Sequence, residues 1–153
     1  MSAEQFYLFV LIVHVTASAV WVGGAVFSEL ILSPTFVAFK KVYQTNSLTT
    51  SSTKSFVKMV WISLPLMSVT GLAMLFSKGL LSAEFLLHEA AGLVMSVGIM
   101  LTVLAMINAG VITFVLMPRG SGWIPRAIRL NLALGISIVV LMALFPETAA
   151  LLA

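Results

Sequence analysis

The stretch His14–Val15–Thr16–Ala17–Ser18–Ala19–Val20–Trp21–Val22–Gly23–Gly24 decides how this chain folds. It lies in a long apolar segment, residues 5–33, that is interrupted only by His14 and Glu29. A helix of about 20 apolar residues crosses a bilayer, and His14 lies ~13 Å along such a helix, inside the ~30 Å hydrocarbon core. An ionisable side chain at that depth usually serves a function. Seven residues later, Trp21 returns to nearly the same helix face.

The composition predicts an all-α integral membrane protein. Of the 153 residues, 61% are hydrophobic and 8% are charged, whereas soluble domains carry about 25% charged residues. The chain has no cysteine, which excludes disulfides, iron–sulfur clusters and thiolate chemistry. The formal charge of +3 is too small to indicate nucleic-acid binding.

The apolar pattern predicts one domain, residues 1–153, built as a four-helix transmembrane bundle. The expected spans are residues 5–33, 54–77, 83–117 and 125–145, and the Ser/Thr-rich residues 45–53 are expected to form a cytoplasmic linker. Ser2 and Gln5 have the spacing of a capping box, and Ser82 is a plausible N-cap of the third span. Pro65 inside the second span suggests a kink.

Basic residues predict the orientation of the bundle. Seven of the eight lie in or beside the two loops on one side: Lys40, Lys41, Lys54, Lys58, Arg119, Arg126 and Arg129. The positive-inside rule assigns that side to the cytoplasm, so both termini are expected outside the cell membrane.

The chain's two histidines then fall in the same half of the bundle. His14 lies ~13 Å and His88 ~7 Å into parallel spans, a difference that helix tilt could absorb. Imidazoles from two helices of a bundle can ligate haem, so the pair predicts a haem b site with both histidines as iron ligands. The residues expected around the macrocycle are Trp21, Gly23, Gly24, Gly92 and Met95. The alternative is that the histidines bond neighbouring carbonyls and the glycines serve helix packing.

The motif His-x6-Trp-x-Gly-Gly over residues 14–24 resembles the first helix of the copper resistance protein D family and its small relatives. It is also similar to the bacterial membrane protoporphyrinogen oxidases of the HemJ type. The resemblance implies that His14 is a haem ligand or a metal site. The oxidases are expected to carry a lysine in a later helix, and none lies in the third span here. The larger copper-resistance proteins have more spans and external metal ligands.

Three further predictions concern polar residues near the cytoplasmic side. Glu29 is expected to pair with Lys40, Arg126 or Arg129, with a place on a proton path as the alternative. Asn108 is expected to hydrogen-bond between helices. Arg126 and Arg129 are expected to bind anionic lipid headgroups, with contact to the propionates of a more deeply placed haem as the alternative.

These observations favour a b-type cytochrome that transfers electrons as a small subunit of a membrane oxidoreductase or respiratory complex, rather than a free-standing enzyme. The expected partners are the lipid bilayer, other membrane subunits or a second copy, and quinone. The alternatives are a copper-handling or structural membrane subunit and a protoporphyrinogen oxidase-like enzyme.

Overall fold

The computed structural model describes residues 2–32 and 45–144, which form helices and contain no strand. The α-helices are α1 (Ala3–Phe27), α3 (Thr45–Ser77), α4 (Ala83–His88), α5 (Ala90–Val111) and α6 (Ile124–Leu144). Two π-helical segments, η1 (Ser28–Leu32) and η2 (Ile112–Leu116), continue α1 and α5. Lys40, Lys41 and the end of the fourth predicted span lie outside the described residues.

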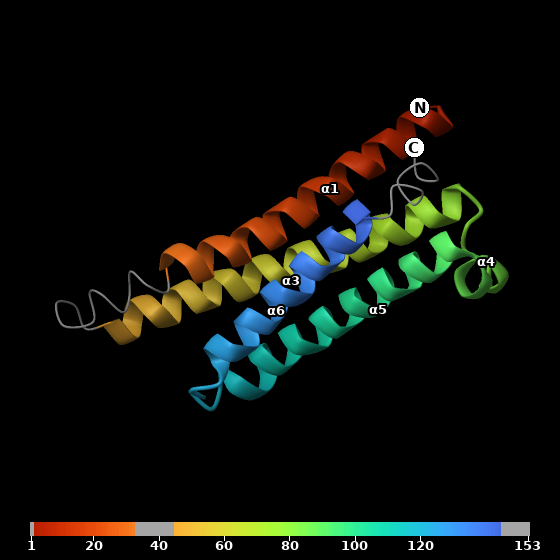
Figure 1. Cartoon of the computed structure of the whole chain (residues 1–153). Helices are drawn as coiled ribbons and strands as arrows, with labels where there is room; N and C mark the ends of the chain where they lie inside the picture. The colour runs from red at the N-terminus through yellow and green to blue at the C-terminus, as the bar shows by residue number, and fades with distance from the viewer. Residues whose placement is uncertain (1, 33–44, 145–153) are drawn as a thin grey trace.

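The long helices form two antiparallel hairpins packed against each other (Figure 1). α1 packs most extensively on α3, and α5 on α6. Four stretches are long and apolar enough to cross a membrane: Glu4–Leu30, Lys54–Ser77, Ala90–Leu116 and Ile124–Leu144. The prediction of four long apolar helices is therefore confirmed. Large apolar side chains on their outer faces, such as Phe76 and Phe114, are exposed, as expected in lipid.

Two predicted helix starts are confirmed. The Ser2 hydroxyl accepts a hydrogen bond from the Gln5 amide at 3.2 Å, and the Gln5 side chain accepts one from the Ser2 amide at 2.9 Å. The Ser82 hydroxyl accepts from the Phe85 amide at 3.2 Å. Each contact satisfies an amide that the helix itself leaves unpaired.

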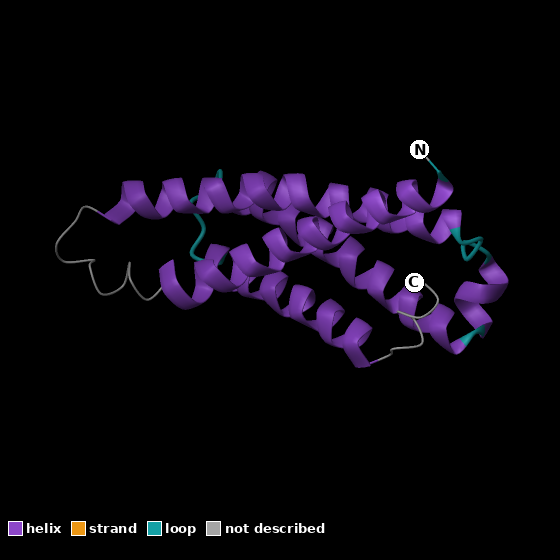
Figure 2. Ribbon diagram, turned by 90° about the horizontal axis from the view of Figure 1, so that it is seen from above, coloured by secondary structure: helices purple, strands orange, loops and turns teal. Residues whose placement is uncertain are grey.

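The third span differs from the prediction of one helix over residues 83–117. Glu89 has extended backbone angles, φ −86° and ψ 139°, and separates the short α4 from α5. Figure 2 shows α4 as a separate turn of helix at the end of the bundle. His88 is consequently the last residue of α4 rather than part of the long helix.

Close packing between α4 and α5 accounts for this break. A Cβ on Gly92 would lie 2.6 Å from the Phe85 carbonyl carbon and 2.9 Å from the Leu86 Cα, so only glycine permits the approach. The Ser96 hydroxyl also donates to the Leu86 carbonyl at 2.9 Å. Sequence periodicity could not predict these contacts, because no proline or glycine lies at the break itself.

Residues 45–53 also differ from the prediction. They were expected to form a linker, and in the structure they form the first turns of α3. Serine and threonine cost only a few tenths of a kcal/mol per residue in a helix, and extending a helix avoids the cost of nucleation. α3 continues through Pro65 to Ser77.

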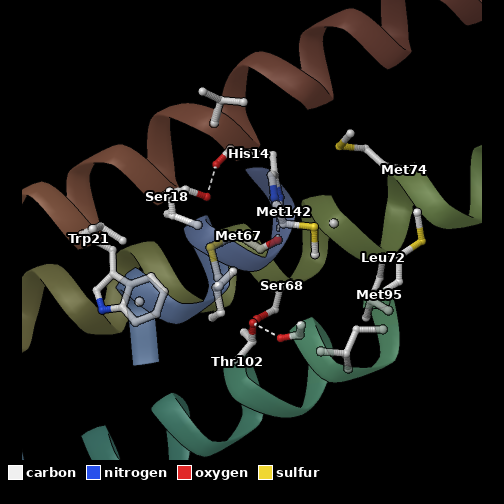
Figure 3. A pocket seen from close by; sticks show the side chains of 18 of the residues that line it. His14, Ser18, Trp21, Met67, Ser68, Leu72, Met74, Met95, Thr102 and Met142 are labelled. Atoms are coloured by element: carbon white, nitrogen blue, oxygen red, sulfur yellow. Dashed lines mark hydrogen bonds between the residues drawn. The ribbon is translucent and has the colours of Figure 1, made fainter. Parts of the chain in front are cut away.

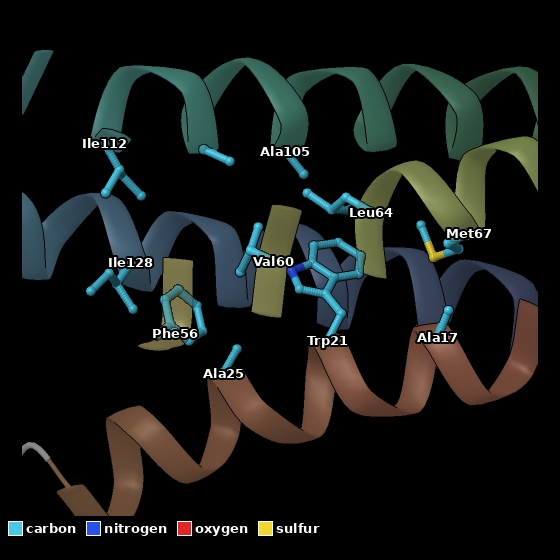
Figure 4. Close-up of a cluster of buried hydrophobic side chains, with 11 residues drawn as sticks. Ala17, Trp21, Ala25, Phe56, Val60, Leu64, Met67, Ala105, Ile112 and Ile128 are labelled. Carbon is cyan, nitrogen blue, oxygen red and sulfur yellow. The ribbon is translucent and has the colours of Figure 1, made fainter. Parts of the chain in front are cut away.

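All four long helices contribute to a buried apolar core (Figure 4). Trp21 of α1 is its largest side chain and is 1% exposed. The prediction for Asn108 is confirmed, since its side-chain amide donates to the Ala127 carbonyl of α6 at 2.8 Å. The core thus holds α1 and α6 in fixed positions relative to α3 and α5.

Candidate functional site

A half-enclosed cavity of about 510 Å³, here called the bundle cavity, lies between α1, α3, α5 and α6 (Figure 3). Its volume falls in the range of sites for organic ligands and cofactors, roughly 300–1,000 Å³. Its lining is mainly apolar. Apart from Trp21, the lining side chains with nitrogen or oxygen atoms are His14, Ser18, Ser68 and Thr102.

Hydrogen bonds orient the His14 imidazole and assign its tautomer. Nδ1 lies 2.9 Å from the Met67 carbonyl oxygen and 3.1 Å from the Thr70 hydroxyl oxygen. The Thr70 hydroxyl lies 2.7 Å from the Leu66 carbonyl, to which it donates. Because a carbonyl can only accept, Nδ1 carries the proton and Nε2 keeps its lone pair. Hydrogen bonding of this kind at Nδ1 is typical of histidines that bind metals through Nε2.

The hydroxyl groups of the cavity are directed to backbone carbonyls. Each donates to a carbonyl one turn earlier on its own helix: Ser18 to His14, Ser68 to Leu64, and Thr102 to Gly98. Among the lining side chains, Nε2 of His14 is therefore the nitrogen base available to a ligand.

Thioether side chains line the same cavity as His14. Five of the chain's nine methionines line the cavity: Met67, Met74, Met95, Met106 and Met142. Sequence reasoning selected Met95 alone and interpreted the others as space-filling residues. The spacing of seven residues on α3 and eleven on α5 places each pair on one helix face, and this was the available signal. Thioether sulfur ligates haem iron and Cu(I).

Three glycines make room for the cavity's side chains. A Cβ on Gly71 would lie 3.1 Å from His14 Cε1, and one on Gly98 would lie 2.8 Å from Met142 Cε. A Cβ on Gly135 would lie 3.5 Å from Trp21 Cη2. Sequence reasoning missed all three.

The glycines expected at the site lie elsewhere. Gly23 would have nothing within 4 Å of an added Cβ, and Gly24 packs against Met59 Sδ, 2.6 Å from the added atom. Gly92 belongs to the contact between α4 and α5. None of the three lines the bundle cavity.

The structure thus brings three of the predicted site residues together: His14, Trp21 and Met95 line one cavity. His88 is exposed at the end of α4 and does not line it. The expected pairing of the two imidazoles across one ligand is absent from the bundle cavity.

Charged residues near the other end of the bundle form local contacts. Arg129 of α6 pairs with Glu29 of η1, which confirms one of the predicted partners. The Arg126 guanidinium lies 4.6 Å from the centre of the Trp123 ring, a cation–π contact. Lipid headgroup binding by either arginine stays a prediction.

Comparison with protein-family models, curated proteins and solved structures found no match for this chain. The functional proposal therefore rests on the geometry of the bundle cavity. The family resemblance of residues 14–24 stays a prediction from that motif. Within it, His14 and Trp21 line the cavity, whereas Gly23 and Gly24 do not.

Proposed function

We propose that this protein is a membrane-spanning, b-type cytochrome-like electron carrier that binds haem in the bundle cavity through His14. The observation behind this proposal is the contact of His14 Nδ1 with the Met67 carbonyl, from which we infer that Nε2 keeps its lone pair in an apolar cavity of cofactor size. One of the five cavity methionines would supply the second iron ligand, because His88 does not line this cavity.

The proposed orientation has both termini outside the cell and the loop between η2 and α6 in the cytoplasm. The support is the distribution of charge along the helices. Lys54, Lys58, Arg119, Arg126 and Arg129 gather at one end of the bundle, and Glu4, Lys78, Glu84 and Glu89 at the other.

The same tautomer disfavours an oxidised quinone, though not a quinol hydroxyl, as the ligand of His14. Nε2 is an acceptor, and a quinone carbonyl is also an acceptor, so the two form no hydrogen bond. Protonating the imidazole would place a charge in an apolar, lipid-embedded cavity at considerable cost. A Lewis-acidic metal matches the lone pair directly, and His/Met ligation of haem iron is a known arrangement.

The cavity residues meet most requirements of haem. His14 and five methionines provide the donor set, and Gly71, Gly98 and Gly135 make room for the side chains that line the cavity. The lining contains no lysine or arginine, so haem carboxylates would gain no ion pair from it. When bound, haem supplies one-electron chemistry.

The chain's own residues hold and shield the site in this proposal. The Met67 carbonyl and Thr70 hydroxyl keep the imidazole oriented and increase its basicity through the Nδ1–H bond. Trp21 and the aliphatic lining keep water from the ligand. The electron partner is proposed to be another membrane subunit.

A second candidate, Cu(I) handling, is favoured by the donor set itself. One imidazole and several thioethers are soft ligands that suit Cu(I). The cavity volume of about 510 Å³ favours a macrocycle over a single ion. The two candidates predict different metals in the same cavity.

The test is purification of the full chain after expression with added haemin, with oxidised and reduced absorption spectra. We expect a Soret band in the wild type, its loss in His14→Gly, and its recovery when free imidazole is added. Exposed His88 provides the matched control, because His88→Ala should keep the band. A colourless wild type overturns the haem proposal. Copper without iron in elemental analysis supports the second candidate.

A further inference from the structure

Two polar side chains are buried in the core between α1 and α6 without a partner among the described residues. Trp21 is 1% exposed and Asn131 is 0% exposed. The indole Nε1 of Trp21 and both carboxamide atoms of Asn131 make no hydrogen bond within the described part of the chain. Buried polar groups are nearly always paired, with protein or with ordered water, so these three atoms require a ligand.

The two side chains lie in the same layer of the core. A Cβ on Gly135 would lie 3.6 Å from Trp21 Cζ2, which is on the Nε1 edge of the indole. Asn131 is four residues before Gly135, so the two positions are neighbours on one face of α6, about 5–6 Å apart. Figure 4 shows Trp21 projecting from α1 into this core. The indole N–H edge therefore faces α6 within one helical turn of Asn131.

The chemistry of the three atoms selects the ligand. Indole Nε1–H can only donate, whereas the carboxamide offers one acceptor and two donor hydrogens. Val60, Leu64 and Ala105 make the adjoining core apolar, and they supply no charge to balance an ion. A neutral molecule that both accepts and donates can bridge the indole N–H and the carboxamide oxygen, and buried waters typically make about three such bonds.

We propose that Trp21 and Asn131 bind an internal water that accepts from the indole N–H and donates to the Asn131 carbonyl oxygen. The water links α1 to α6 and fixes the indole where it forms the wall of the bundle cavity. The inference does not depend on the proposed function, because the water site exists whichever ligand occupies the cavity.

Nuclear magnetic resonance of the full chain in detergent micelles tests the proposal. Indole ¹⁵N labelling gives one signal for each of the three tryptophans, assigned through Trp61→Phe and Trp123→Phe. We expect a nuclear Overhauser cross-peak between the Trp21 indole proton and water, and its loss in Asn131→Leu. The Trp61 indole, which donates to Thr113 at 2.9 Å, reports whether that variant keeps its fold.

Three results overturn the proposal. The first is a wild-type Trp21 indole without a water cross-peak, which would also be the sign of a direct bond to Asn131. The second is a cross-peak that persists unchanged in a folded Asn131→Leu variant. The third is rapid exchange of the Trp21 indole proton with bulk solvent, at the rate of the exposed Trp123. If Asn131→Leu does not fold, the presence or absence of the water cross-peak in the wild type decides the proposal.

Discussion

Gly92→Ala should displace α4 from α5, whereas Gly110→Ala on the same helix should not. An added Cβ at Gly92 would lie 2.6 Å from the Phe85 carbonyl carbon, and one at Gly110 would have nothing within 4 Å. Carbon atoms in contact stay ~3.5–4 Å apart, so α4 must shift by about 1 Å. Because the obstacle is backbone, a side-chain rotation cannot relieve it.

The magnitude follows from two opposing terms. Replacing a helical glycine by alanine stabilises the helix by up to ~1 kcal/mol, and this term acts at both positions. Overpacking costs about 1–3 kcal/mol and acts only at Gly92. The difference between the two variants therefore isolates the steric cost. We expect Gly92→Ala to be less stable than Gly110→Ala by about 1–3 kcal/mol.

The assay combines thermal unfolding in detergent with a spin label on α4. The chain has no cysteine, so Leu87→Cys, at an exposed position of α4, provides a unique labelling site. Gly92→Ala should lower the melting temperature and increase the label's mobility, and Gly110→Ala should do neither. Equal stability and equal label mobility in the two variants would refute the packing of α4 on α5. That result would also remove the reason for placing His88 outside the bundle cavity.

Two further substitutions test local contacts. Ser2→Ala removes the capping box and should cost about 1 kcal/mol, with faster hydrogen exchange at the Gln5 amide; unchanged exchange would contradict the cap. Glu29→Gln removes the ion pair with Arg129; the Arg129 side chain is 60% exposed and that of Glu29 is 18% exposed, so solvent reaches the pair from the arginine side and the change should cost about 1 kcal/mol in chemical denaturation at low salt. That cost should shrink at high salt, so a large, salt-independent loss would contradict an exposed pair.

The sequence predicted those parts of the fold that depend on local chemistry and overall apolarity. Runs of apolar residues located the four long helices, and the caps at Ser2 and Ser82 located the starts of α1 and α4. The break at Glu89 was not predictable, since it depends on contacts between α4 and α5 around Gly92. The helical state of residues 45–53 was not predicted, because their serine and threonine content is typical of a linker. An existing helix can nevertheless extend through such residues at little cost.

The candidate site was predicted in part for a related reason. His14 was identifiable from its depth in an apolar span, and Trp21 and Met95 from their expected positions near it. His88 was assigned to the site through a helix that the structure divides. Charge and length determine which half of the bundle a residue occupies, but only packing between helices determines which residues face one cavity.

The glycines show most clearly what a single-helix motif lacks. In the motif of residues 14–24, the two large side chains reach the cavity, and each meets a glycine from another helix: His14 meets Gly71 and Trp21 meets Gly135. A bulky side chain can enter a four-helix core only where the facing helix leaves space. The motif therefore specifies half of each contact, and the other half lies on α3 and α6. A chain with the same motif but larger residues at positions 71 and 135 would crowd this imidazole and this indole, so the motif alone does not define the cavity.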